Sequence, residues 1–310
     1  MYLLKKLVFI IIFFFCCNSS FSQIYNQELI TQLEQIVKAD SHYRTMSVDT
    51  GKKYGWNSPQ ATVIMHKQRT VDIENLIKVD IIIDQYGYPG KTLVGEDLMS
   101  AAFLVIQHSD PDVQAAYLPL LTNAANKGEL SWSSLALMID RVKMGNGEKQ
   151  VYGSQMMEHN NVRQLYPIED EMNVNVRRAK IGFSPLEEYL KTFGLDYKVP
   201  TAAGNLNPAG MYVDRTDSFT PFVKPVGGYE AIYSKIIYPK KARSKSVNGI
   251  VIIKFTVDTN GSTKNIQVAK SLGSGCDEEA LRVIREAKFT NINGGDYAMR
   301  LKMPFPYKKN

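Results

Sequence analysis

The stretch IVIIKFTVD at residues 250–258 constrains the fold of this chain more than any other part of the sequence. Its odd-numbered positions carry the apolar side chains Val251, Ile253, Phe255 and Val257. Because successive side chains of a strand point to opposite faces, this alternation predicts a β-strand with one buried face. Asn260-Gly261 follows, a dipeptide that favours a tight hairpin turn. Residues 264–270 are therefore expected to return as the paired strand.

Helical patterns flank this hairpin on both sides. Residues 227–237 place apolar side chains at helical spacing and stop at Tyr238-Pro239, because proline cannot continue a helix. After the hairpin, the acids of residues 277–279 precede basic residues in the later turns, which complements a helix dipole. The last strand is expected over residues 297–307, with Pro304 marking an edge. Residues 228–310 thus predict a compact αββαβ domain with a small antiparallel sheet.

The order of these elements resembles the C-terminal domain of the TonB energy-transducer family. The residues that carry the resemblance are Tyr238-Pro239, Ala242, Gly249, Phe255-Thr256-Val257-Asp258, Gly261, Val268, Ser271, Cys276-Asp277, Ala280-Leu281 and Pro304. Two features depart from the family pattern. Phe289 stands in the segment where the family has a tryptophan, and the proline usual just beyond it is absent.

This resemblance implies a periplasmic binding module without a cofactor. Family members pair the edge of their small sheet with an extended segment of an outer-membrane receptor, so the expected partner is an envelope protein of that kind. Strand 297–303 is the expected edge. The implied partner-binding residues are Tyr238, Pro239, Tyr297, Met299, Leu301 and Met303.

Residues 23–194 predict a mainly helical domain with a small β excursion, so that the whole chain is of the α+β class. Leu29, Ile30, Leu33 and Ile36 form the apolar stripe of a first helix. Further helices are expected from Ser58-Pro59, over 71–84, from Leu98 to Ile106, from Pro111, after Ser131 and over 184–194. Residues 145–155 suggest a turn into short strands. Residues 195–227 contain four prolines and no sustained period, which is typical of a linker.

Several polar residues interrupt the helical pattern in an order that resembles a bacterial domain family of unknown activity. The matching elements are Asp84 to Pro89, Val94-Gly95, Gln107-His108, Asp140-Arg141 and Tyr152 to Gln155. The resemblance implies a shared fold and a shared site, and names no reaction. Each residue taken singly also has a purely structural explanation, such as a histidine favoured by the dipole at a helix C-terminus.

Taken together, these residues form a candidate catalytic site. His108 would act as a base, Asp140 would orient it, and Arg141 would hold the charge of an anionic or acyl substrate. Asp84, Gln107, Tyr152 and Gln155 are candidate pocket residues. Histidines 42, 66, 108 and 159 show no metal-ligand spacing, and no dinucleotide or phosphate-loop motif occurs, so we expect neither a metal nor a cofactor.

The N-terminus has the pattern of a secretory signal peptide. Lys5 and Lys6 precede eleven apolar residues, 7–17, and a short polar stretch with small residues. Eleven helical residues span about 17 Å, against about 30 Å for the core of a bilayer. We therefore expect residues 1–22 to be cleaved after Ser22, which leaves a periplasmic protein without a membrane span. An uncleaved anchor and lipidation at Cys16 or Cys17 are the alternatives.

Three hypotheses for function follow from these features. In the first, an exported protein uses its TonB-like domain to bind an envelope protein, with a link to TonB-dependent transport. In the second, the helical domain is an enzyme of a hydrolase-like kind, and the C-terminal domain is its tether. In the third, an uncleaved N-terminus anchors an unusual energy transducer. The net charge of +6 is too small and too dispersed to indicate nucleic-acid binding.

Overall fold

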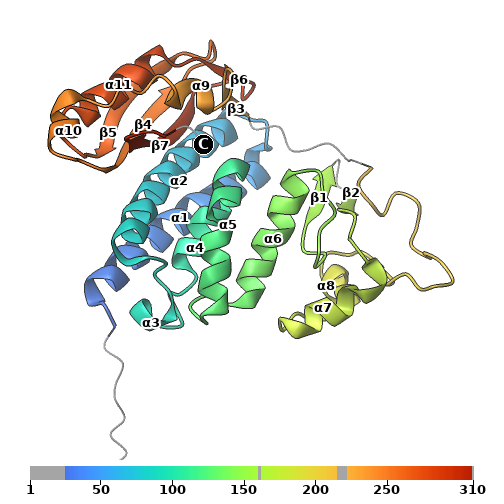
Figure 1. Cartoon of the computed structure of the whole chain (residues 1–310). Helices are drawn as coiled ribbons and strands as arrows, with labels where there is room; N and C mark the ends of the chain where they lie inside the picture. Colours follow the sequence, from blue (N-terminus) through green and yellow to red (C-terminus); the bar gives the residue numbers. More distant parts are fainter. Residues whose placement is uncertain (1–24, 160–161, 215–221, 309–310) are drawn as a thin grey trace, which may run out of the picture.

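The computed structural model describes residues 25–159, 162–214 and 222–308. The expected leader and its cysteines lie outside these residues. A helical domain is followed by a small domain of strands and helices, and the two lie against each other (Figure 1). The α+β class and the small antiparallel sheet near the C-terminus are confirmed.

Six helices of the first domain surround one apolar core. They are α1 (Gln27–Tyr54), α2 (Pro59–Tyr86), α3 (Lys91–Val94), α4 (Ala101–Gln107), α5 (Pro111–Asn126) and α6 (Trp132–Gly145). Side chains cap three of the N-termini: Asn26 accepts from Leu29 N–H, Ser58 from Ala61 N–H and Ser131 from Ser134 N–H. Fully buried core residues include Leu33, Leu76, Ile106, Leu121, Leu135 and Met138.

The main difference from the sequence prediction concerns α2. Separate helices were expected to begin at Ser58-Pro59 and near residue 71, but α2 is one helix of 28 residues. No glycine or proline interrupts residues 60–86, so the backbone has no reason to break. The helix at Leu98 is also shorter than expected, because residues 97–100 form turns and α4 begins at Ala101.

A smaller unit follows α6 and includes most of the expected linker. Its elements are β1 (Met156–His159), β2 (Val162–Leu165), the 3-10 helix η1 (Glu171–Asn173), α7 (Val174–Lys180) and α8 (Leu186–Lys191). Tyr197 and Met211 are buried in its core, and Val213 N–H donates to Leu165 O at 2.9 Å. Residues 195–213 therefore pack onto this unit rather than connecting two bodies freely.

The C-terminal domain contains a three-stranded antiparallel sheet in the order β5-β4-β7. Its strands are β4 (Gly249–Val257), β5 (Thr263–Lys270) and β7 (Tyr297–Phe305), and the helix α11 (Cys276–Glu286) packs on one face. The predicted hairpin is confirmed, with Gly261 at a φ of 75°. Around the sheet lie α9 (Glu230–Tyr233), α10 (Lys240–Ser244) and the paired strands β3 (Val223–Pro225) and β6 (Phe289–Asn291).

Both faces of this sheet are covered. Val251 and Ile253 face the core under α11, as the alternation predicts. Ile252, on the opposite face, is 0% exposed because it packs against Ile73 and Ile77 of α2. The prediction of a single buried face is therefore wrong: the helical domain covers the second face, as Figure 1 shows where α2 runs up to the sheet.

Candidate functional site

The outer margin of β7 is the candidate site for a partner. The backbone oxygen of Ala298 accepts from Arg69 Nε at 2.9 Å, so it points away from β4. In an antiparallel pair the direction of the backbone groups alternates along the strand, so the N–H and C=O of Arg300 and Lys302 also point outward. No strand within the described ranges pairs with this margin.

A groove of about 440 Å³ runs along this margin. Its walls come from both domains and from the segment at α9. The lining residues are Met299, Arg300, Leu301 and Lys302 on β7; Asp110, Asp112, Val113, Ala116 and Tyr117 at and along α5; and Tyr229 and Tyr233. Its volume lies within the range of about 300 to 1,000 Å³ that is usual for ligand pockets. We call it the β7 groove.

The opposite edge of the sheet is less suited to pairing. The register of β5 against β4 shifts at two places, between Ile252 and Ile253 and between Lys254 and Thr256. Asn265 on β5 has a φ of 53°, in the left-handed region. Such bulges twist a strand and interrupt its ladder. The regular register of β7 makes it the better template for an added strand.

The side chains predicted to bind a partner also make contacts within the protein. Met299, Leu301 and Met303 are buried in the core of the C-terminal domain, so β7 offers its backbone to the groove. Tyr238 and Pro239 lie before α10 and do not line the β7 groove. The hydroxyl of Tyr238 donates to the backbone oxygen of Val247 at 2.6 Å and so closes the turn after α10.

One buried carboxylate joins the two domains beside the groove. Asp80 of α2 is 0% exposed and lies 2.9 Å from Lys302 Nζ and 3.0 Å from Arg300 Nε. Tyr117 of α5 donates its hydroxyl to the same carboxylate. Burial and the charge of Asp80 raise the pKa of Tyr117, so this hydroxyl stays protonated and remains a donor. We call these four residues the Asp80 clasp.

A second set of contacts fixes the other end of β7. Arg69 of α2 binds Asp110 through Nη2 at 2.6 Å and Nη1 at 3.1 Å, which is a bidentate ion pair. The hydroxyl of Tyr297 donates to Asp110 at 2.8 Å, and the guanidinium of Arg69 lies 4.2 Å from the centre of the Tyr297 ring. Arg69 also covers the Ala298 carbonyl, so the open part of the margin begins at Arg300.

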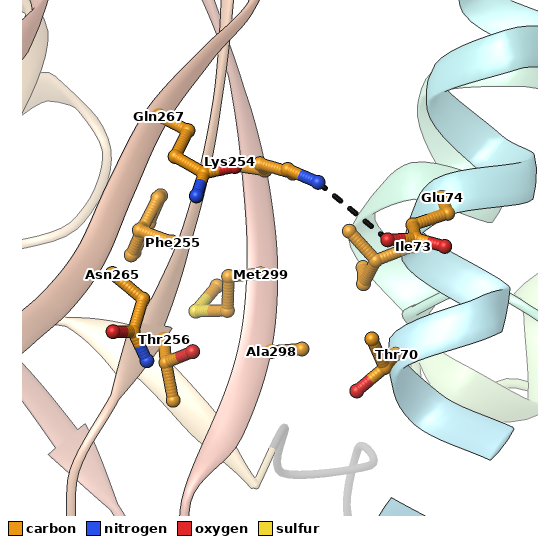
Figure 2. A pocket seen from close by; sticks show the side chains of 10 residues that line it. All are labelled: Thr70, Ile73, Glu74, Lys254, Phe255, Thr256, Asn265, Gln267, Ala298 and Met299. Carbon is orange, nitrogen blue, oxygen red and sulfur yellow. Dashed lines mark ion pairs between the residues drawn. The ribbon is translucent and has the colours of Figure 1, made fainter. Parts of the chain in front are cut away.

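The remaining ion pairs between the domains lie on the exposed side of α2. Glu74 and Lys254 are 3.5 Å apart at the rim of a pocket of about 170 Å³, and Figure 2 shows this pair bridging the helix and the sheet. Asp84, which was predicted as a residue of a catalytic pocket, instead lies 2.6 Å from Lys270 Nζ of β5. The acids thus come from the helical domain and the cations from the sheet, which fixes how the domains fit.

His108, the candidate base, is oriented by Asp40 of α1. The distance between His108 Nδ1 and Asp40 Oδ1 is 3.1 Å. Burial raises the pKa of Asp40, but hydrogen bonds from His108 and Arg44 outweigh that effect and lower it overall. Arg44 also binds Asp72 of α2 at 2.8 Å. Asp40 continues the spacing of the buried residues Leu33 and Ile36. An acid within an apolar stripe needs a buried partner, and this pattern could have identified Asp40 from the sequence.

Asp140, which was predicted to orient His108, holds a loop instead. Its side chain accepts from the backbone N–H groups of Val151 at 2.7 Å, Tyr152 at 2.9 Å and Ser154 at 2.9 Å. Burial raises the pKa of this carboxyl group, and these three hydrogen bonds act in the opposite direction. Asp140 therefore ties the YGSQ segment to α6.

The other candidate pocket residues also make local contacts. The ring of Tyr152 packs edge-on against Phe183, and Gln155 Nε2 donates to Ser154 Oγ at 2.9 Å. Gln107 accepts from Gln114 through its backbone oxygen at 2.9 Å. The sequence-predicted residues are thus not brought together: His108 pairs with Asp40, Asp140 holds the loop with Tyr152, and Asp84 lies at the interface with the sheet. Within residues 25–159, 162–214 and 222–308, no group of three His, Cys, Asp or Glu side chains could hold a metal ion.

Comparison with known proteins places the first domain in a family. Residues 26–200 match the model of a family of unknown function, DUF6624, and this match covers more than half of the 310 residues. The chain belongs to this family. The DUF6624 match spans the helical bundle and the unit of α7 and α8, so it includes both the His108 network and the Asp140 loop. The predicted resemblance to a family of unknown activity is confirmed.

The second domain matches a different model. Residues 234–308 match the Gram-negative bacterial TonB protein C-terminal model, which confirms the second resemblance and indicates a protein of the cell envelope. The solved TonB C-terminal domain of Pseudomonas aeruginosa is 21% identical, with 29% of this chain and 92% of that chain covered, at a TM-score of 0.23. No curated protein matches. Across the part of the chain that the structure describes, no helix is long and apolar enough to cross a membrane.

Proposed function

We propose that this protein is exported to the periplasm and binds an extended segment of an envelope protein along β7, inside the β7 groove. The observation that carries the proposal is the outward-facing backbone of Arg300 and Lys302, bordered by a groove of about 440 Å³. An added strand would gain a backbone ladder from β7, and the groove walls would select its side chains. A periplasm-facing segment of an outer-membrane receptor fits this role and would link the protein to TonB-dependent transport.

The DUF6624 domain takes part in this recognition. Because α5 supplies one wall, the groove exists in this form only while the two domains are docked. Asp112 accepts from the hydroxyl of Tyr229, which joins α5 to the segment at α9 across the groove. A segment that enters between β7 and α5 therefore contacts both domains. The helical domain acts as half of a composite binding site.

Replacing Lys302 tests strand addition, because two variants of this residue separate the side chain from the backbone. Lys302→Met and Lys302→Pro both lose the ammonium group that contacts Asp80, but only proline loses the outward N–H. The probes are synthetic peptides of the periplasm-facing segments of outer-membrane receptors from the same cell. We expect Lys302→Pro to bind about 5-fold more weakly than Lys302→Met, since one hydrogen bond contributes about 1 kcal/mol.

Isothermal titration calorimetry measures both affinities on the whole chain. Circular dichroism of each variant confirms that the sheet is intact. Equal affinity of the two variants would show that the peptide does not pair with the β7 backbone. Failure of the unsubstituted chain to bind any of these peptides would contradict the choice of partner.

A further inference from the structure

Arg141 on α6 is a half-buried cation without an acceptor. Neither its Nε nor its terminal nitrogens donate a hydrogen bond to any residue that the structure describes, and Nε is completely enclosed. The other four half-buried or buried arginines described in this domain are satisfied: Arg44 and Arg69 bind carboxylates, and Arg177 and Arg178 donate to backbone oxygens. Arg141 is therefore an exception that calls for a physical reason.

The surroundings of Arg141 make its charge still less favourable. Burial lowers its pKa first, and the positive charge of Arg44 lowers it further. Arg44 itself is held by Asp40 and Asp72, at 2.9 and 2.8 Å, so these two carboxylates are already engaged. A guanidinium group stays protonated in proteins, so Arg141 cannot avoid the unfavourable charge by losing its proton. A half-buried charge whose Nε is enclosed without an acceptor is unfavourable, and an anion bound at the terminal nitrogens would offset that cost.

We infer that Arg141 is an oxyanion-binding residue of the DUF6624 domain, and that its ligand carries a carboxylate or a phosphate group. The planar guanidinium presents parallel N–H donors that match the oxygens of either group. The charge of Arg44 acts on Arg141, and Asp40 links Arg44 to His108, which is 24% exposed. This site is separate from the β7 groove, and it does not depend on how the TonB-like domain binds its partner.

Titration of the whole chain with inorganic phosphate, and separately with acetate, tests the inference. The readout is the NMR signal of the Arg141 Nε–Hε group, followed at constant ionic strength in sodium chloride. We expect a saturable shift with at least one of the two anions, and the stronger of the two identifies the ligand group. Arg163→Gln is the matched control, because Arg163 is exposed and paired with Glu158 at 2.7 Å. It should bind as the unsubstituted chain does.

Two variants complete the experiment. Arg141→Gln should lose the saturable binding, and Arg141→Lys, which keeps the charge but not the fork, should bind at least 10-fold more weakly. If Arg141→Gln does not fold, the affinity of Arg141→Lys and the saturable shift of the unsubstituted chain test the inference in its place. A linear shift that appears equally at Arg163 would mean charge screening only and would overturn the inference. Unchanged affinity in the Arg141 variants would overturn it as well.

Discussion

Replacing Asp80 by alanine is expected to lower the free energy of unfolding by about 3 to 5 kcal/mol, the usual cost of removing one partner from a buried ion pair. The variant leaves Arg300 and Lys302 against α2 without their carboxylate, and the Tyr117 hydroxyl loses its acceptor. Asp80 is 0% exposed and the Arg300 side chain 9%, so the charge of Arg300 loses a buried partner that water replaces only in part. Urea denaturation followed by circular dichroism measures the change.

Glu74→Ala is the matched control for Asp80→Ala. Glu74 lies on the same helix and pairs with Lys254 of the same sheet, but both side chains are more than a third exposed. An exposed pair contributes about 0 to 1 kcal/mol, so this variant should unfold almost as the unsubstituted chain does. Similar small effects of both variants would mean that the domains are not held together through Asp80.

Replacing Asp140 by alanine is expected to destabilise the protein by about 3 kcal/mol or more. Three backbone N–H groups lose their acceptor, one of them in a buried and two in a partly buried hydrogen bond, and a fully buried donor without a partner costs about 1 to 3 kcal/mol. Asp140→Asn keeps one acceptor oxygen, so its free energy of unfolding should lie between those of the unsubstituted chain and Asp140→Ala. Glu148→Ala removes an exposed carboxylate that pairs with Lys143 of α6 at 2.9 Å, and it serves as the control with a small effect.

Amide hydrogen exchange shows whether the effect of Asp140→Ala arises at the predicted place. The amides of Val151, Tyr152 and Ser154 should exchange faster in this variant, while that of Leu165 should change much less. The sequence hypothesis, in which Asp140 orients His108, predicts unchanged amides in residues 151–154. Unchanged exchange there, together with a small loss of stability, would contradict the structural role of Asp140.

Local patterns in the sequence were sufficient for individual elements. The alternation from Val251 to Val257 and the turn at Gly261 predict β4 and its hairpin, because neighbouring residues determine both. Ser58 and Ser131 mark helix starts in the same way, since each caps its own helix. α2 was divided in error because its apolar residues serve two cores, Leu76 and Val79 in the bundle and Ile73 and Ile77 against the sheet. Apolar residues that face two cores do not form the single stripe by which a helix is recognised in a sequence.

The contacts between the domains could not be predicted from the sequence. Lys254, Arg300 and Lys302 alternate with apolar residues, a pattern that normally indicates a solvent-exposed face. They pair with Glu74 and Asp80, more than 170 positions earlier in the chain, and no local pattern connects residues so distant. The candidate site shows the same limit. His108 was recognised as a candidate, but its partner Asp40 lies on a helix far from it in sequence.

The most direct test of the account concerns the β7 margin itself, measured by amide hydrogen exchange of the whole chain without any partner. We expect the amides of Met299, Leu301 and Met303, which bond to β4, to exchange slowly. The outward amides of Arg300 and Lys302 should exchange much faster, because the groove leaves them without an acceptor. Equal protection of all five amides, independent of protein concentration, would mean that the chain covers its own margin and would contradict the proposed docking along β7.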